Sequence, residues 1–135
     1  MKTITVWKGE HLFESTQPDA GKLLMDGNTK TAMSPKALLL AGLAGCSSID
    51  VVDILKKMRV ECKGLSVVAE AEQTEDSPRV FKDILLTFQV NTDPLNIEKV
   101  KKAIDLSMEK YCGVAAMLRK NSEIRYELTI NGDLQ

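Results

Sequence analysis

The sequence predicts an α+β fold, organised as one domain over residues 1–135. Segments that alternate between apolar and polar residues lie before, between and after two helical segments. This order differs from the regular strand–helix alternation of a parallel α/β protein. The composition, with 44% hydrophobic and 27% charged residues, is typical of a soluble globular chain. A chain of this length buries enough surface to fold without a disulfide or a metal ion.

Three short strands are predicted in the first 30 residues. Ile4 and Val6 alternate with threonines, which is the period of a half-buried strand. Two further strands are expected at residues 11–15 and 22–25. The Asp-Gly-Asn sequence at residues 26–28 indicates a turn after them, because Gly and Asn tolerate positive φ.

A long helix is predicted over residues 35–59. Ser34 can cap its first amides, and the proline that follows suits the first helical position. Residues 37–46, ALLLAGLAGC, leave the helix without a polar face, and such a helix must be covered on all sides. Gly42 and Gly45 indicate a close neighbouring backbone, since each costs about 1 kcal/mol of helix propensity. We therefore expect a central helix at the core of a homodimer.

Two antiparallel strands, a second helix and a last strand are expected after the long helix. Residues 65–71 and 84–90 have the period-2 pattern of half-buried antiparallel strands. The second helix should begin near Asn96, break at residues 111–113 and resume as a short helix. Residues 124–130 alternate most regularly and predict the last strand. The expected apolar positions of the second helix are Ile97, Val100, Ile104, Met108 and Tyr111.

Charge and hydropathy narrow the classes of partner. Lys and Arg number 18 against 19 Asp and Glu, a net charge of −1, which argues against binding to nucleic acid or to an anionic membrane. The first residues lack the apolar stretch of a secretory signal. The longest segment of low polarity, residues 37–49, is too short to span a bilayer. We expect a cytoplasmic protein without a membrane partner.

The three cysteines, Cys46, Cys62 and Cys112, cannot form a closed disulfide framework. No CxxC motif or Cys/His pair indicates zinc, and we expect neither a metal nor a cofactor. His11 is the only histidine, which excludes a multi-histidine site and makes it most simply a surface side chain. In a reducing compartment, cysteines are either inert core residues or reactive thiols.

Each cysteine has a structural and a functional interpretation. Cys46 lies where the apolar part of the long helix meets polar residues, Asp50 among them; it is either a small buried hydrophobe or a reactive thiol. Cys112 follows Lys110 at the break of the second helix. It is either a packed turn residue or an exposed thiol whose thiolate is stabilised by amides and charge. Cys62 is interpreted as a bystander.

The segments around Cys46 and Cys112 resemble two motifs of the OsmC/Ohr family, whose names refer to osmotic induction and organic hydroperoxide resistance. They are residues 34–52, SPKALLLAGLAGCSSIDVV, and residues 107–114, SMEKYCGV. The resemblance is greatest to the YhfA-like branch of small redox proteins, and it covers nearly the whole chain. It implies an α+β fold in which two subunits intertwine and antiparallel sheets wrap the long central helices.

The same resemblance implies a thiol peroxidase. Cys46 would be the peroxidatic residue, which attacks the O–O bond of an organic hydroperoxide and becomes a sulfenic acid. Cys112 would resolve that sulfenic acid to a disulfide, and a dithiol reductant would restore both thiols.

The chain departs from the family pattern at the groups that activate the peroxidatic thiol. Active members use an Arg from the N-terminal strands and a Glu directly after the proline of the helix start. Here the first arginine is Arg59, and the proline is followed by Lys36 and an alanine. Lys36, ten residues before Cys46, and Glu109, beside the second motif, are the remaining candidates for groups that assist the thiols.

A second interpretation follows from this departure. The protein would be a non-catalytic OsmC-like protein that binds a small apolar or electrophilic ligand at a dimer cleft. A Cys hydrolase is disfavoured, because no histidine lies near Cys46 or Cys112 in the sequence. The rate at which Cys46 reacts with a hydroperoxide, compared with the rate for Cys62, distinguishes the peroxidase from the ligand-binding protein.

Overall fold

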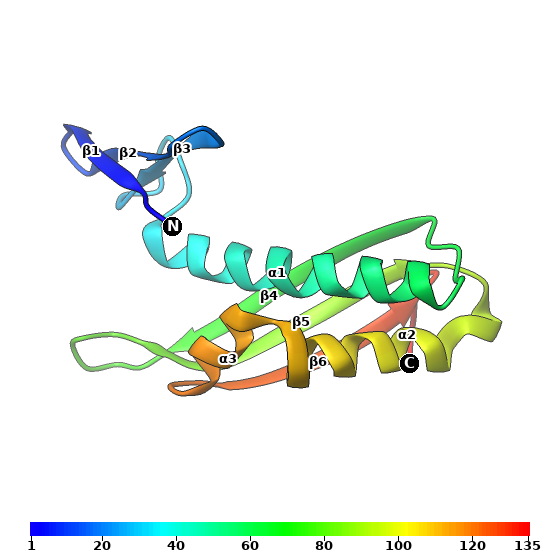
Figure 1. The fold of residues 1–135 in the computed structure, drawn as a ribbon. Helices are drawn as coiled ribbons and strands as arrows, with labels where there is room; N and C mark the ends of the chain where they lie inside the picture. The colour runs from blue at the N-terminus through cyan, green and yellow to red at the C-terminus, as the bar shows by residue number, and fades with distance from the viewer. The chain divides into compact units, whose positions relative to one another are not determined.

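The computed structural model describes all residues from 1 to 135, and its mixture of two sheets and three α-helices confirms the α+β class (Figure 1). Its contacts divide the chain into two compact units, Met1–Leu39 and Leu40–Gln135. The elements, in chain order, are β1 (Ile4–Gly9), β2 (Leu12–Gln17), β3 (Gly21–Asp26), α1 (Pro35–Lys57), β4 (Gly64–Gln73), β5 (Phe81–Asn91), the 3-10 helix η1 (Pro94–Asn96), α2 (Ile97–Leu106), the π-helix η2 (Ser107–Tyr111), α3 (Gly113–Arg119), β6 (Glu123–Ile130) and β7 (Asp133–Leu134).

The first unit contains a three-stranded antiparallel sheet in the order β1-β2-β3. The predicted turn follows β3, where the buried Asp26 carboxylate accepts the backbone N–H groups of Asn28 at 2.8 Å and Thr31 at 3.2 Å. These bonds, the one from Asn28 above all, hold the pKa of Asp26 below its usual range. The sheet leaves large apolar side chains exposed: Ile4, Val6, Trp7, Phe13, Leu23 and Leu24.

Helix α1 begins as predicted, with the Ser34 hydroxyl accepting the N–H of Ala37 at 3.2 Å. One face of the helix is buried by residues four apart, namely Leu43, Ser47, Val51 and Leu55. The opposite side is open within this chain, where Ile49 is 66% exposed. A Cβ added at Gly42 or Gly45 would meet nothing within 4 Å. Within this chain, therefore, no backbone lies close to either glycine, and the close neighbour that they predict stays a prediction.

By length and composition alone, α1 could cross a membrane, a possibility that the length of the 37–49 segment did not predict. The core helices of soluble proteins meet the same criteria. In this structure, Leu43, Val51 and Leu55 of α1 pack into the core together with residues of the strands.

The second unit holds a four-stranded sheet in the order β4-β5-β6-β7. Strands β4 and β5 pair antiparallel, as predicted, from Gly64 opposite Asn91 to Gln73 opposite Phe81. The expectation of purely antiparallel sheets is wrong at the next pair, because β5 and β6 run parallel. The chain between these two strands crosses back through α2, η2 and α3, and such a helical crossover returns the next strand in the same direction.

Helices α1 and α2 lie on one face of this sheet (Figure 1), and the core is formed between these helices and the sheet. Phe88 at its centre is fully buried and meets Tyr126 edge to face, with ring centroids 6.1 Å apart. The Tyr126 hydroxyl donates to Asp105 of α2 at 2.7 Å. Burial, and then this contact, raise the pKa of Tyr126. The bond therefore links α2 to β6 across the layer.

The regular helical spacing of the second helix ends earlier than predicted. Met108 is buried as expected, but Tyr111 is 58% exposed. The chain forms the π-helix η2 from Ser107 onwards, and the wider π turn breaks the 3.6-residue register that would have placed Tyr111 on the apolar face.

Candidate functional site

Cys46 lies in the middle of α1, in the second unit, and its side chain is half-buried against the core. It follows Gly45, which faces open space, and precedes Ser47, which is fully buried. The cysteine therefore lies at the border between the buried and open sides of the helix.

Cys112 lies where η2 ends and α3 begins. Its backbone is extended, with φ −72° and ψ 104°, and its sulfur caps α3 by accepting the N–H of Ala115 at 3.3 Å. The predicted helix break is thus confirmed. Of the two interpretations of Cys112, the structure agrees with the packed turn residue and not with the exposed thiol, because only 3% of Cys112 is exposed.

The electrostatics of Cys112 also disagree with the interpretation in which amides and charge stabilise its thiolate. The pKa of the Cys112 thiol is raised to about 11, first by burial and then by its interaction with Cys46, against the opposing effect of the Ala115 N–H. Amides alone do not outweigh the loss of solvation of a thiolate. Cys112 therefore remains a thiol at neutral pH.

Because the Cys46 side chain influences the pKa of Cys112, and Cys46 packs against the core cluster that contains Cys112, the fold brings the two cysteines near each other, although 66 residues separate them in the sequence. Both cysteines are free thiols. Chemically, the arrangement is a half-buried sulfur with a buried thiol beside it.

The other predicted residues occupy different places. Glu109 is an exposed residue of η2, and its charge contributes to the raised pKa of Tyr126. Lys36 is exposed in the first turn of α1. A direct role of either at the thiols stays a prediction. Cys62 is half-buried and donates to the Gly64 carbonyl at 3.4 Å. His11 is exposed, as expected, and pairs with Asn28 at 2.8 Å.

Two contacts that support the turn before Cys112 were not predicted from the sequence. The buried Ser107 hydroxyl lies 3.0 Å from the Asp50 carboxylate. Arg119, at the end of α3, donates to the Met108 carbonyl at 2.9 Å. The spacing of Asp50 after Cys46 places the two on one face of the helix but gives no sign of the Ser107 hydroxyl, which lies 57 residues away in the sequence.

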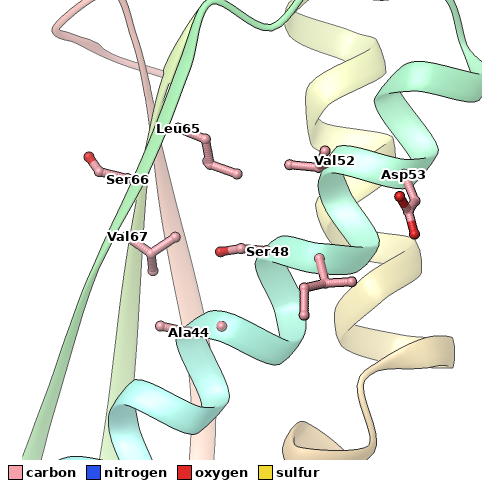
Figure 2. A pocket seen from close by; sticks show the side chains of 9 residues that line it. Ala44, Ser48, Val52, Asp53, Leu65, Ser66 and Val67 are labelled. Carbon is pink, nitrogen blue, oxygen red and sulfur yellow. The ribbon is translucent and has the colours of Figure 1, made fainter. Parts of the chain in front are cut away.

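A groove along α1 has residues close to Cys46 in the sequence among its lining, but neither Cys46 nor Cys112 lines it. It has a volume of about 560 Å³ between α1 and β4. Figure 2 shows Leu65 and Val67 of β4 pointing towards α1, where Ala44 and Val52 face them. Neither cysteine is among its lining residues. The groove is thus a feature separate from the two cysteines. No cluster of three His, Cys, Asp or Glu side chains that could hold a metal ion is present.

Comparisons with known proteins agree with the resemblance of the motifs. The family model for OsmC-like proteins matches residues 27–127. Protein YhfA of Escherichia coli (strain K12) is 37% identical over 131 residues, 96% of this chain and 98% of YhfA. A hypothetical protein from Aquifex aeolicus VF5 has a TM-score of 0.81 at 26% identity, covering 96% of each chain. The organic hydroperoxide resistance protein OhrB of Bacillus subtilis has a TM-score of 0.65 at 25% identity, covering 95% of this chain and 96% of OhrB.

Proposed function

Because the chain belongs to the OsmC-like family, in the branch that includes protein YhfA, we propose that it is a thiol-dependent redox protein that reduces organic hydroperoxides. The observation that carries the proposal is the contact between the Cys46 and Cys112 side chains. The similarity to OhrB, a protein named for organic hydroperoxide resistance, supports the substrate class.

In the proposed cycle, the Cys46 thiolate attacks one oxygen of the O–O bond. The bond breaks, the alkoxide leaves and takes a proton as an alcohol, and Cys46 becomes a sulfenic acid. The Cys112 sulfur then attacks the sulfenic sulfur, releasing water and forming the Cys46–Cys112 disulfide. A dithiol reductant supplies two electrons and two protons to restore both thiols.

The division of roles rests on the surroundings of Cys112. A buried thiol with a pKa of about 11 is a poor first nucleophile. The same thiol is suited to the second step, because it is already in contact with Cys46 and is shielded from solvent oxidants. The half-buried Cys46 is left with the first step.

We also propose that the protein is a homodimer in the cytoplasm, with no nucleic-acid or membrane partner. The apolar open side of α1, where Ile49 and Val52 are 66% and 46% exposed, supports a second copy as its cover. The exposed apolar side chains of the β1–β3 sheet support it further. Three free cysteines suit a reducing compartment. Light scattering during gel filtration would detect a mass near twice 14.9 kDa.

A second candidate function is favoured by one observation. The first turn of α1 carries no acidic residue. The activating Glu of the family pattern is therefore missing, and Lys36 is the residue directly after the proline. A protein without that group could instead bind a small apolar or electrophilic ligand, with the cysteines as contact residues.

Mass spectrometry separates the two functions. Reduced protein would be treated with one equivalent of cumene hydroperoxide, and its peptides mapped over time. The peroxidase predicts a rapid loss of two hydrogens that maps to a Cys46–Cys112 bridge, is absent in Cys46→Ser and is retained in Cys62→Ser. If Cys46 is oxidised no faster than Cys62, the peroxidase proposal is wrong and the ligand-binding function gains support.

A further inference from the structure

The Ser107 hydroxyl connects the π turn to α1 next to Cys46. Ser107 is fully buried and is the first residue of η2. Its hydroxyl oxygen lies 3.1 Å from the backbone carbonyl of Ser47 and 3.0 Å from the Asp50 carboxylate. Ser47 is the residue after Cys46, and Asp50 lies one helical turn beyond it on the same face. The π turn is thus attached to the part of α1 that carries the first thiol.

The backbone of Ser107 is attached to the other thiol. Its carbonyl accepts the N–H of Cys112 at 2.8 Å, a bond that spans five residues and closes the π turn. One residue therefore contacts α1 with its side chain and Cys112 with its main chain. A shift of Ser107 relative to α1 would move Cys112 relative to Cys46.

Of the two acceptors, Asp50 is the one that side-chain chemistry can vary. A serine hydroxyl has a single proton to donate. The Ser47 carbonyl is a backbone group within α1, whereas an ionised carboxylate accepts about twice as strongly as a neutral oxygen. The Ser47 hydroxyl does not interfere with the bond between Ser107 and Asp50, because it donates to the Leu43 carbonyl at 2.9 Å. Asp50 thus directs the Ser107 hydroxyl.

We propose that Asp50 and Ser107 are positioning residues, whose hydrogen bond holds the π turn so that the Cys112 thiol faces Cys46. The inference rests on the proposed function for its use in the cell. Its physical content is the effective concentration of one thiol at the other, which can be measured without any hydroperoxide.

The test uses the full chain with Cys62→Ser, equilibrated in mixtures of oxidised and reduced dithiothreitol. Oxidised dithiothreitol takes two electrons and two protons from the Cys46 and Cys112 thiols, which form a disulfide while the dithiothreitol ring opens. The equilibrium constant of this exchange reports how well the fold positions the two sulfurs. Quenched samples are resolved by peptide mass mapping.

Ser107→Ala and Asp50→Ala are each expected to lower this constant about tenfold or more, the scale set by loss of a buried, charge-assisted bond. Asp50→Asn keeps an acceptor for the hydroxyl and should restore most of the loss. Two matched controls should stay within about twofold of the parent. Ser122→Ala removes another buried serine hydroxyl, which donates to the Phe81 carbonyl at 2.8 Å. Asp53→Ala removes an exposed acid of α1.

The proposal is overturned if Ser107→Ala changes the constant no more than Ser122→Ala, or if Asp50→Ala equals Asp53→Ala. Asp50 is only half-buried, so its variants test the idea even where Ser107→Ala fails to fold by circular dichroism. A parent that forms the bridge with dithiothreitol but not with cumene hydroperoxide sinks the proposed function and leaves this inference standing. A parent that forms no bridge at any ratio removes both.

Discussion

The protonation state of Cys112 decides which thiol reacts first, and it can be measured directly. In the Cys62→Ser protein, burial should keep the pKa of Cys112 near 11. At pH 7.5 the ionised fraction of such a thiol is about 3 × 10⁻⁴, against about 0.09 for a thiol of ordinary pKa near 8.5. Ionisation alone should therefore slow alkylation of Cys112 about 300-fold relative to the same residue in the unfolded chain. Its low exposure can only slow the reaction further.

The assay is alkylation with iodoacetamide, followed by peptide mass mapping that reports Cys46 and Cys112 separately. Initial rates are taken from about pH 6 to about pH 11, in the native protein and in guanidinium chloride. The native rate at Cys112 should still be rising at about pH 10. A plateau near pH 8.5, or faster alkylation of Cys112 than of Cys46 at neutral pH, would refute the reasoning and reverse the two roles.

Three further predictions concern stability. Folding raises the pKa of Cys112 and of Tyr126, so both groups stabilise the native state below their ordinary pKa values, and this contribution is lost as the pH rises through the native ones. Urea unfolding should give a smaller free energy at about pH 10.5 than at about pH 8, with a weaker decline in Cys112→Ser. Ile104→Ala, at a fully buried position, should cost about 2–5 kcal/mol, whereas Met117→Ala, at a 67% exposed one, should change stability by less than about 0.5 kcal/mol. Asp26→Asn should speed amide hydrogen exchange at Thr31. The Thr31 N–H and hydroxyl both donate to the Asp26 carboxylate, and the asparagine replaces one of its two acceptor oxygens with an NH₂ group, which cannot accept these bonds.

Local chemistry predicted most of the elements. The serine–proline pair marked the start of α1, and alternation marked β4, β5 and β6, because caps and period-2 patterns depend only on neighbours in the chain. The direction of β6 depends on how the intervening chain crosses the sheet. A strand buried on one face has the same alternation in either direction, so the parallel pairing of β5 with β6 could not be read from residues 124–130.

The π turn explains the other errors of prediction. The helical pattern of α2 continues in the sequence as far as Tyr111, and nothing in the spacing of Met108 and Tyr111 signals a wider turn at Ser107. That turn leaves Tyr111 exposed and carries Cys112 into the interior. One of the two interpretations of Cys112 took the thiol to be exposed, as a residue at a helix break often is. Here Cys112, at the break, belongs to the buried core cluster.

The candidate site was predictable as far as its two cysteines, since each belongs to a recognisable motif. Its supporting bonds were not, because Ser107 and Asp50 belong to segments 57 residues apart and each has an ordinary local explanation. Asp50 alone counts against Cys46 as a nucleophile, because a carboxylate on the same helical face disfavours a thiolate. In the structure, the Asp50 carboxylate accepts a hydrogen bond from the Ser107 hydroxyl. Part of the carboxylate's charge is therefore engaged by a donor from the π turn. A residue that weakens the site when only its own helix is considered thus becomes, with its partner in place, a residue that holds the second thiol against the first.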